Sequence, residues 1–281
     1  PKQPEPADRI GQGELVVTYI NHATILIQMD GMNILTDPVW SSTVGPFGVI
    51  GPGRIRNPGV SMDDLPKIDL ILISHDHWDH LDLPSLRTIY NRDKPRVLAG
   101  LGVDSILVKN GITRVKTLDW WHQFQLKNNS IRVVFVPAVH GSGRWPLASN
   151  RTLWGGFVIE SAAGNVYFAG DTGYGDFLQQ IAQNFGQFRL AIFPVGSYEK
   201  RWFMKNRHMN PEDAVISHLE LNAYQSIGMH FATFVEHPEQ AVDAHEKDLE
   251  AALIKHHVSP AAFRLLKFGQ GLKFGTTKSQ Y

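Results

Sequence analysis

Short apolar runs separated by turn residues make up the first part of the chain. A lead-in rich in proline and charge, residues 1–13, is predicted to be flexible. Apolar runs then follow at 15–20, 24–27 and 32–35 and predict three strands. Because the Asp30-Gly31 pair between the last two runs is a strong signal for a tight hairpin, we expect a strand meander here.

Strands and helices alternate in the next part of the chain. The apolar run at 70–73 predicts a buried strand, and Asp82 followed by Pro84 predicts the start of a helix. Residues 96–99 predict a further strand, and residues 103–110 a short helix closed by a glycine. The pattern has therefore passed from a meander to strand–helix alternation.

The same order of elements is predicted a second time in the rest of the chain. Two strand pairs are expected, at 123–127 with 131–137 across Asn128-Asn129, and at 153–160 with 166–169. They are followed by a helix at 176–184, a strand at 190–194, a capped helix beginning at Asn210-Pro211, a strand at 223–229, an amphipathic helix at 238–257 and one or two strands within 263–274. Two such blocks predict an α+β fold, in which two mixed sheets pack face to face with helices outside as a four-layer αββα sandwich. We expect this single domain to cover residues 14–281.

Composition narrows the class of protein. The chain has 281 residues with equal numbers of basic and acidic side chains, 27 of each, so a general nucleic-acid binder is not expected. The absence of cysteine excludes disulfides and thiolate metal sites. No apolar run approaches the ~20 residues needed to cross a bilayer. Because the chain starts without methionine, we expect a native N-terminal segment to be missing, which leaves its location open between soluble and peripherally membrane-associated.

Four potential metal ligands lie within six residues directly after the strand at 70–73. They are His75, His77, Asp79 and His80. Residues at this spacing in a turn that leaves a strand can converge on one point, and two neighbouring ions use four such ligands better than one ion does. Imidazole and carboxylate ligands indicate a borderline metal, with zinc first and manganese or iron as alternatives. The competing interpretation is a solvated loop that happens to be rich in histidine.

Three further candidate ligands, His140, Asp171 and His230, each follow a predicted strand. Ligands at strand ends gather along one edge of a sheet. We assign His75, His77 and His140 to one ion and Asp79, His80 and His230 to a second, with Asp171 bridging both. The result would be a two-metal centre with ions ~3.5–4 Å apart.

This order of ligands resembles the signature of the metallo-β-lactamase fold superfamily. The chain further resembles one branch of it, the N-acyl-phosphatidylethanolamine-hydrolysing phospholipase D family and its bacterial relatives. The matching stretches are Asn21-His22-Ala23-Thr24, Leu35-Thr36-Asp37-Pro38, Ile73-Ser74-His75, Gly170-Asp171-Thr172-Gly173-Tyr174, Arg201-Trp202-Phe203-Met204 and His208-Met209-Asn210-Pro211-Glu212-Asp213-Ala214. Together they span most of the chain between residues 15 and 235, and every ligand position of the superfamily is filled.

The expected reaction is metal-assisted hydrolysis of a phosphodiester. A water between the two metals would lose a proton, because zinc lowers its pKa to about 7, and would attack the phosphorus as a metal-bridging hydroxide. Asp171 would orient this nucleophile. The resemblance implies an N-acyl-phosphatidylethanolamine-like phospholipid or a small phosphodiester as substrate. A peripheral membrane contact and a homo-oligomer are compatible with this prediction.

Two other functions fit the same residues. One is a metal-dependent lactonase or small-ester hydrolase of the same fold. The other is a metal-dependent binding module without catalysis, which would leave an open hydrolytic site idle. Basic and apolar residues in the glycine- and proline-rich loop at 39–67 favour the lipid phosphodiesterase over the lactonase, and the complete ligand set disfavours the binding module.

Three residues are candidates for contact with the substrate. The resemblance suggests that His208 meets the phosphate or the leaving oxygen, and imidazole is the usual proton donor near neutral pH. Tyr198 could donate to the substrate or simply be packed. Arg54 follows the apolar tip of the 39–67 loop and could meet an anionic group or be solvated.

Supporting roles are predicted for a few more side chains. Asp37 could orient a ligand histidine, since metal-bound imidazoles often need a carboxylate partner. His22 is interpreted as a structural or supporting residue, because the ligand set is complete without it. Arg201-Trp202-Phe203-Met204 forms either a lip for an acyl chain or an anchor in the core.

Overall fold

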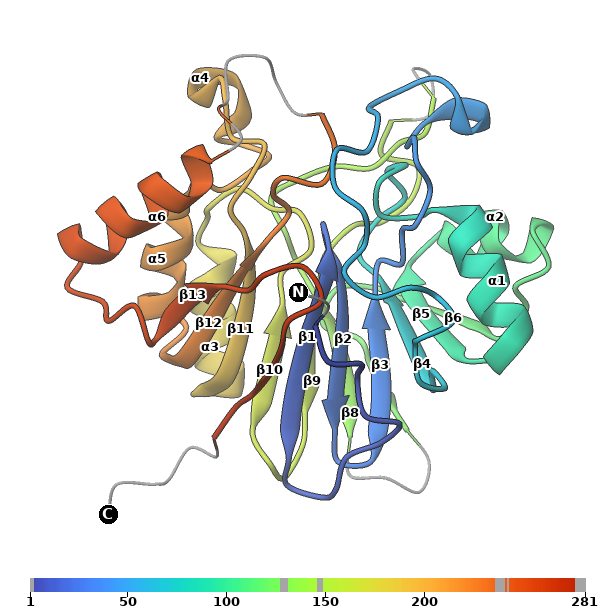
Figure 1. The fold of residues 1–281 in the computed structure, drawn as a ribbon, viewed down its shortest axis with the longest axis horizontal. Helices are drawn as coiled ribbons and strands as arrows, with labels where there is room; N and C mark the ends of the chain where they lie inside the picture. Colours follow the sequence, from blue (N-terminus) through green and yellow to red (C-terminus); the bar gives the residue numbers. More distant parts are fainter. Residues whose placement is uncertain (1–2, 127–130, 146–148, 236–240, 242, 276–281) are drawn as a thin grey trace.

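The computed structural model describes residues 3–126, 131–145, 149–235, 241 and 243–275. Within these ranges the strands form two seven-stranded mixed sheets. The first sheet has the order β14-β1-β2-β3-β4-β5-β6 and the second the order β13-β12-β11-β10-β9-β8-β7. Both sheets carry helices on their outer sides, which confirms the predicted αββα sandwich (Figure 1).

The first sheet begins as the predicted meander and continues with parallel strands. Its strands are β1 (Leu15–Asn21), β2 (Thr24–Met29), β3 (Met32–Thr36), β4 (Leu70–Ile73), β5 (Arg96–Gly100), β6 (Val115–Leu118) and β14 (Gly271–Lys273). β1, β2 and β3 pair antiparallel, whereas β3, β4, β5 and β6 pair parallel. The hairpin between β2 and β3 turns at Asp30-Gly31, as its sequence predicts.

The second sheet repeats this plan. Its strands are β7 (Gln123–Gln125), β8 (Arg132–Val136), β9 (Gly156–Glu160), β10 (Asn165–Phe168), β11 (Phe188–Pro194), β12 (Ala223–Met229) and β13 (Phe263–Leu265). β7 to β10 pair antiparallel, and β10 to β13 pair parallel. The turn predicted at Asn128-Asn129 lies outside the described residues.

The helices fall into two outer groups. α1 (Leu83–Asp93) and α2 (Val103–Lys109) lie beside β4, β5 and β6. α3 (Phe177–Phe185), α5 (Pro211–Glu220) and α6 (Ala244–Lys255) lie on the side of β11 and β12 (Figure 1). Two short helices, η1 (Pro46–Gly48) and α4 (Arg201–Met204), lie apart at the upper edge of the molecule.

The strand β4 shows how the two layers of core are built. Leu70 and Leu72 belong to the cluster between the sheets, while Ile71 and Ile73 belong to the cluster under α1 and α2. Because side chains alternate across a strand, a strand buried on both faces is apolar throughout. The run Leu-Ile-Leu-Ile before the first ligand is therefore a fully buried strand, as predicted.

Several predicted boundaries need correction. The amphipathic helix predicted at 238–257 is observed as α6 from Ala244 to Lys255, and residues 236–240 and 242 lie outside the described part. The strand predicted at 153–160 starts only at Gly156. β6 has no counterpart in the prediction, because its four residues make a short, half-buried strand at the sheet edge whose pattern is ambiguous.

The lead-in has no helix or strand in its described part, residues 3–13, yet it contacts the first sheet. Gln28 donates to the Ala7 carbonyl at 2.7 Å, and Arg9 pairs with Asp69 at 2.7 Å. Its predicted flexibility stays a prediction. These contacts place the lead-in along β2 and β3.

Candidate metal centre

Six strands end at the same edge of the sandwich, and each is followed by a residue of one polar cluster. In the first sheet β1 leads to His22, β3 to Asp37 and β4 to the ligand loop at 75–80. In the second sheet β8 leads to His140, β10 to Asp171 and β12 to His230. The two sheets thus supply the cluster from both sides, at the upper edge in Figure 1.

The ligand loop folds back on itself immediately after β4. The backbone amides of His80 and Leu81 donate to the His77 carbonyl at 3.1 and 2.8 Å. This turn brings His75, His77, Asp79 and His80 to one place, as their spacing predicts. The continuous burial of β4 fixes where this turn starts.

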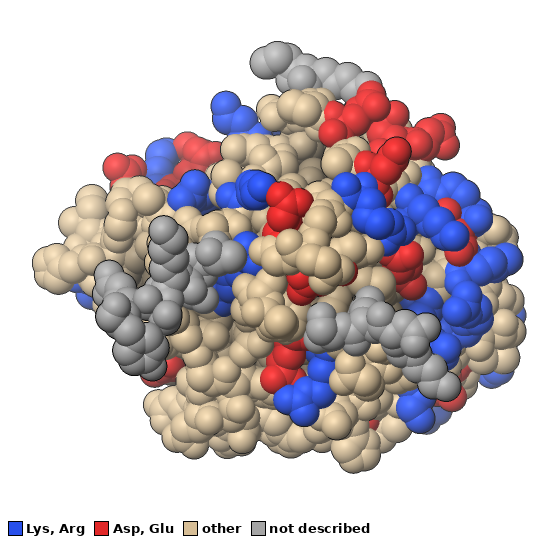
Figure 2. Space-filling model, turned by 90° about the horizontal axis from the view of Figure 1, so that it is seen from below, with Lys and Arg blue, Asp and Glu red and all other residues tan. Residues whose placement is uncertain are grey.

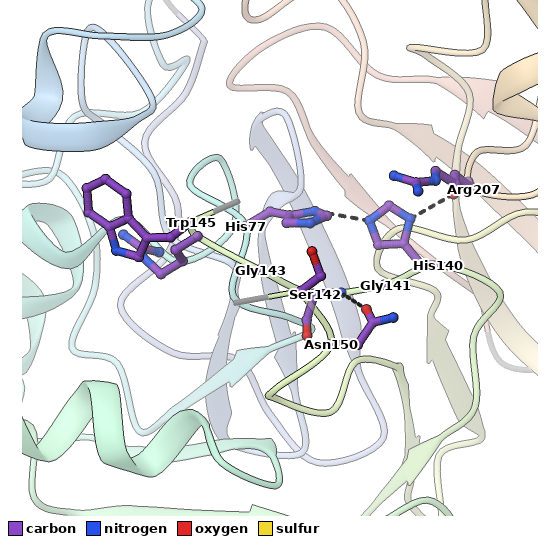
Figure 3. Close-up of a pocket in the computed structure, with 10 residues that line it drawn as sticks. His77, His140, Gly141, Ser142, Gly143, Trp145, Asn150 and Arg207 are labelled. Carbon is purple, nitrogen blue, oxygen red and sulfur yellow. Dashed lines mark hydrogen bonds between the residues drawn. The ribbon is translucent and has the colours of Figure 1, made fainter. Parts of the chain in front are cut away.

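The first group of candidate ligands consists of His75, His77 and His140. Their ligating nitrogens lie within 4.8 Å of one another. His77 Nδ1 is 2.8 Å from His75 Nε2 and 3.2 Å from His140 Nε2. Figure 3 shows the His77 and His140 rings pointing toward each other across the mouth of a pocket. This group matches the set assigned to the first ion.

The second group contains Asp79, His80 and His230, the set assigned to the second ion. Asp79 Oδ2 lies 3.6 Å from His80 Nε2 and 3.7 Å from His230 Nε2. His22 joins this group, with its Nε2 3.0 Å from Asp79 Oδ2. Sequence reasoning favoured a supporting or structural role for His22 over a ligand role, and the structure places it within reach of the same point.

Asp171 lies between the two groups. Its Oδ2 is 3.7 Å from His140 Nε2 on one side, and 3.3 and 3.2 Å from the Nε2 atoms of His80 and His230 on the other. A Cβ on the preceding Gly170, which has a φ of 60°, would lie 2.6 Å from the Ser74 Cβ. Only glycine can occupy that position, so the turn that presents Asp171 depends on it.

The cluster contains buried polar atoms that have no hydrogen-bond partner in the protein. Among the described residues, buried atoms without a hydrogen-bond partner include His80 Nε2, both ring nitrogens of His230, Asp171 Oδ1 and His208 Nδ1. Buried polar atoms are rarely left unpaired, and several that face one point indicate a missing ion or water. Two divalent ions with imidazole and carboxylate ligands would satisfy His80 Nε2, His230 Nε2 and Asp171 Oδ1, while His230 Nδ1 and His208 Nδ1 lie outside the assigned ligand set. The residues therefore fit the predicted metals.

The surroundings of His75, His140 and Asp171 favour the protonation states that bind a metal, which are neutral imidazole and ionised carboxylate. Burial holds the pKa of His75 and His140 well below the usual range, so both imidazoles are neutral. Burial alone would raise the pKa of Asp171, but the neighbouring His230 and His80 hold it well below its usual range. Burial opposes protonation of His80, yet the Asp171 and Asp79 carboxylates raise its pKa well above the ordinary value. A cation between these carboxylates would take the place of the imidazolium charge.

Second partners orient several of the ligand histidines. His80 Nδ1 lies 2.8 Å from Asp37 Oδ2, which is the contact that Asp37 would need to orient a ligand histidine. The same carboxylate accepts from the Ser74 hydroxyl at 2.6 Å, and Ser74 Oγ lies 2.9 Å from His75 Nδ1. His140 Nδ1 donates to the Arg207 carbonyl at 2.9 Å. Such partners fix the ring nitrogen that is left free for a metal.

Backbone strain accumulates in the same cluster. His22, Asp37 and His230 have φ values of 46°, 32° and 63°, in the left-handed region that favours glycine. Strained residues of this kind gather at functional sites, where packing holds them in place. The three residues follow three different strands, so both sheets impose the strain.

The structure brings His208 into the cluster. Its Nδ1 lies 3.8 Å from Asp171 Oδ2, and its ring centroid is 5.1 Å from that of His140. His208 precedes α5, whose start is fixed by a capping box between Asn210 and Asp213, as predicted. This placement is compatible with the predicted contact between His208 and a substrate.

The other two predicted substrate residues are directed elsewhere. The buried Tyr198 donates its hydroxyl to Asp248 on α6 at 2.5 Å. Arg54 donates to the carbonyls of Ser41 and Val39 at 2.9 and 3.1 Å and lies 4.7 Å above the Phe234 ring. These contacts favour structural roles for both residues over the predicted contact with substrate.

A polar pocket of about 360 Å³ opens beside the first group of ligands (Figure 3). His77 and His140 form one wall of it, and Arg207 and the polar side chains of Ser142 and Asn150 contribute to the rest. Sequence reasoning missed Arg207. Its position next to His208 was the available signal, because a basic side chain beside a predicted phosphate contact suits an anion.

Arg144 is a second residue that sequence reasoning missed. It donates to the carbonyls of Asp76 and Leu81 at 2.9 and 2.8 Å, and its guanidinium lies 3.6 Å from the Trp78 ring centroid. The segment after His140 is thereby fastened to the ligand loop. No local sequence pattern announces such a contact, because the partners are 63 or more residues apart along the chain.

Comparison with known proteins identifies relatives of this chain. A family model described as a beta-lactamase superfamily domain matches residues 32–231. An uncharacterized protein of Mycobacterium tuberculosis is 38% identical over 247 residues, which are 86% of this chain and 65% of the relative. The N-acyl-phosphatidylethanolamine-hydrolyzing phospholipase D 1 of Caenorhabditis elegans is 36% identical over 230 residues, 78% of this chain and 64% of that protein. This chain thus spans less than two thirds of either relative.

Solved structures share the fold at lower identity. A metallo hydrolase from Ignicoccus hospitalis superposes with a TM-score of 0.68 at 20% identity, over 94% of this chain and 100% of that one. A diiron beta-hydroxylase from Streptomyces venezuelae gives a TM-score of 0.67 at 21% identity, over 96% of this chain and 55% of that one. These likenesses show the fold alone.

Proposed function

The chain belongs to the beta-lactamase superfamily, and we propose that it is a binuclear zinc-dependent phosphodiesterase of the phospholipase D type. The observation that carries the proposal is the position of Asp171 between two groups of candidate ligands, beside a polar pocket with an arginine. We propose N-acyl-phosphatidylethanolamine or a closely similar phospholipid as substrate. The resemblance to the Caenorhabditis elegans phospholipase supports this choice.

In this proposal His75, His77 and His140 would hold one zinc ion, and Asp79, His80 and His230 would hold the second. Asp171 lies between these two sets and would be within reach of both ions. The bound ions would lower the pKa of water to about 7 and neutralise charge on the phosphoryl oxygens. Manganese or iron would suit a carboxylate-shared pair as well. His22 supports the second group through its contact with Asp79.

The side chains around the ions position the reactants. Asp171 would accept a hydrogen bond from the attacking water and direct its oxygen toward the phosphorus. The bond between phosphorus and the headgroup oxygen breaks, and the headgroup leaves as an alcohol once that oxygen takes up a proton. His208, next to Asp171, can donate its ring N–H to the phosphate or to the leaving oxygen. Arg207 can form charge-assisted hydrogen bonds with the phosphate from the pocket.

The size of the pocket favours a second candidate function. A polar cavity of about 360 Å³ beside His77 and His140 also suits a small lactone or ester. Hydrolysis of such a substrate would use the same ions and the same nucleophile. A lactonase or small-ester hydrolase is therefore the alternative.

The proposal is tested by metal content and product analysis on the purified protein. We expect two zinc ions per chain after reconstitution, and release of phosphatidic acid from N-acyl-phosphatidylethanolamine. Asp79→Ala should lose one ion and more than about a hundredfold of the activity, since even outer-shell changes cost 10- to 100-fold. The matched variant Asp63→Ala, at an exposed position, should behave like the parent protein.

Each other outcome has a defined meaning. Cleavage of a lactone without release of phosphatidic acid would replace the lipid phosphodiesterase by the alternative. Fewer than two ions after full reconstitution, or equal activity of Asp79→Ala and the parent, would contradict the binuclear centre.

A further inference from the structure

Two apolar projections stand on either side of the metal centre. The first, the η1 tip, consists of residues 44–52 around the short helix η1. The second, the α4 tip, consists of residues 200–207 around the short helix α4. Figure 1 shows both at the upper edge of the molecule, the η1 tip on the right and the α4 tip on the left. The strand ends that carry the candidate ligands lie between them.

The exposure of these tips is unusual for large apolar side chains. Phe47 and Val49 on the η1 tip are 83% and 76% exposed, and Trp202 on the α4 tip is 76% exposed. They are the three most exposed large apolar residues in the described part of the chain. Ile50 and Phe203 are also more than half exposed. Exposed apolar groups gathered in one region mark an interaction surface.

Both tips are built to hold these side chains outward. In the η1 tip the amide of Val44 donates to the Pro52 carbonyl at 3.1 Å, which closes the base of the loop. A Cβ on Gly45 would lie 1.8 Å from the Ile50 carbonyl oxygen. The two sides of the loop can therefore approach this closely only with glycine at position 45. In the α4 tip Arg201 donates to the His208 carbonyl at 2.8 Å and pairs with Asp213. Exposure of the apolar side chains is therefore a feature of ordered structure.

A third segment connects the η1 tip with the metal centre. The exposed Trp145 ring lies 6.2 Å from the Phe47 ring and 5.8 Å from the Trp78 ring. Trp78 belongs to the ligand loop and directly follows His77. A continuous row of aromatic rings thus leads from the tip to the first group of ligands.

Three segments around this edge are basic, although the edge also carries the carboxylates of Asp79, Asp171 and Glu199. Residues 40–60, 141–151 and 200–211 contain no Asp or Glu, although the whole chain carries 27 of them. The same segments hold eight basic residues, which are Arg54, Arg56, Arg144, Arg151, Lys200, Arg201, Lys205 and Arg207. On the face seen in Figure 2, from below, acidic and basic side chains are mixed. The exposed residues among these eight, Arg56, Arg151, Lys200, Lys205 and Arg207, are complementary to an anionic partner.

We propose that the η1 and α4 tips dock the protein on the surface of a bilayer that contains anionic phospholipids. Aromatic and aliphatic side chains would enter the interfacial layer, and the basic residues would meet the headgroups. The metal centre between the tips would then face the headgroups directly. Among the described residues, no helix is both long and apolar enough to cross a membrane. The inference rests on the proposed function for its substrate, while docking itself needs no hydrolysis.

A lipid surface explains the arrangement better than a protein partner does. The two tips are separated by a polar cluster, so they do not form the continuous apolar core that a stable protein interface has. Tryptophan and phenylalanine beside lysine and arginine are typical of side chains that reside at the boundary between water and lipid. A flat, fluid surface can accept two separate tips at once.

The test is flotation of the zinc-loaded protein with vesicles that contain no N-acyl-phosphatidylethanolamine. Vesicles of phosphatidylcholine with about a third of phosphatidylglycerol should bind the protein, and vesicles of phosphatidylcholine alone should bind it about tenfold or more weakly. The variant Phe47→Ser/Trp202→Ser should weaken binding to the anionic vesicles by about tenfold or more. The variant Lys200→Glu/Lys205→Glu should have a similar effect that decreases at higher salt concentration.

A matched control removes exposed apolar groups elsewhere. Tyr224 and Ile254 are 52% and 70% exposed and lie on β12 and α6. Tyr224→Ser/Ile254→Ser should bind vesicles like the parent protein. All variants should cleave the soluble phosphodiester bis(p-nitrophenyl) phosphate at the parent rate, because none of the changed residues belongs to the metal centre.

The outcomes separate docking from catalysis. Equal binding of Phe47→Ser/Trp202→Ser and the parent, or no binding to anionic vesicles, would overturn the docking surface and leave the hydrolase untouched. Vesicle binding without cleavage of any phosphodiester would support the docking surface and overturn the proposed function. A dimer in solution that dissociates in Phe47→Ser/Trp202→Ser would assign the tips to a second copy of the chain and overturn the lipid surface.

Discussion

Asp171 lies between the two groups of candidate ligands, where the proposed shared carboxylate would have to lie. Its Oδ2 lies within 3.7 Å of histidine nitrogens that come from β4, β8 and β12. Asp171 therefore contacts residues that follow strands of both sheets. Its own strand, β10, lies in the second sheet, like β8 and β12. Its low pKa keeps it ionised, as a shared metal ligand must be.

The contact between Asp37 and the His80 ring gives a second testable prediction about a single residue. Asp37→Asn keeps the size of the side chain but removes the negative charge that faces His80 Nδ1 at 2.8 Å. Because outer partners of metal-bound histidines tune the ligands, we expect zinc affinity or hydrolysis to fall by about 10- to 100-fold. Competition with a chelator measures the affinity, and Asp63→Asn serves as the matched control. An unchanged zinc affinity together with unchanged hydrolysis would remove Asp37 from the supporting set.

The elements that hold the ligands were largely predictable from sequence. β4 is a run of four apolar residues that ends at the first ligand, and the start of α5 carries a complete capping signal. β12 ends directly before His230. In each case the signal is local, because burial on both faces or a cap leaves its mark within a few residues.

Other features depend on contacts that are distant in sequence. The four residues of α4 lack the length needed for a periodic pattern, and only the structure shows that Trp202 and Phe203 point outward. The core-anchor interpretation therefore does not hold for these two exposed side chains. Asp82 occupies the predicted start of α1, but its side chain accepts from the Ser41 hydroxyl at 2.8 Å and makes no cap bond within the helix. A carboxylate that holds a remote loop has the same sequence signal as one that caps a helix.

The fastening of the ligand loop by Arg144 is a prediction about how two segments pack. Arg144→Lys loses the planar group that stacks on Trp78 and bonds two carbonyls at once. We expect the free energy of unfolding to fall by about 2 kcal/mol, since hydrogen bonds from a charged donor contribute about that much. Urea denaturation measures the change. Arg151→Lys, at an exposed position, is the control, and equal stability of both variants would contradict the assigned role.

At the scale of the whole molecule, one buried arginine links segments from both ends of the chain. Arg189 on β11 donates to the carbonyls of Gly13, Ala163, Phe274 and Gly275 at distances of 2.7 to 3.1 Å. These carbonyls come from the lead-in, the β9–β10 hairpin and the end of β14. The Arg189 side chain therefore links the second sheet, to which β11 belongs, with segments next to the first sheet.

Arg189→Met should test this link, because methionine fills the space of the stem without any donor. Carbonyls left without partners cost free energy, so we expect the unfolding free energy to fall by about 3 kcal/mol. Thermal or urea denaturation of the metal-free protein gives the number, and the exposed Arg87→Met serves for comparison. If Arg189→Met is as stable as Arg87→Met, the two sheets are held together by their apolar contacts alone.

The fold by itself does not select the reaction. Structures named as a metallo hydrolase and as a diiron beta-hydroxylase both superpose on this chain with TM-scores near 0.7. Function lies in the site that a fold carries. For this chain the candidate site consists of Asp171, the six other candidate ligands around it and the exposed apolar side chains at the same edge.

The most direct test of the central claim is anomalous X-ray diffraction from crystals of the zinc-loaded protein, measured on both sides of the zinc absorption edge. The proposal predicts two zinc peaks about 3.5–4 Å apart, with Asp171 in contact with both. His75, His77 and His140 should surround one peak, and Asp79, His80 and His230 the other. A single peak, or two peaks of which only one contacts Asp171, would contradict the shared binuclear centre.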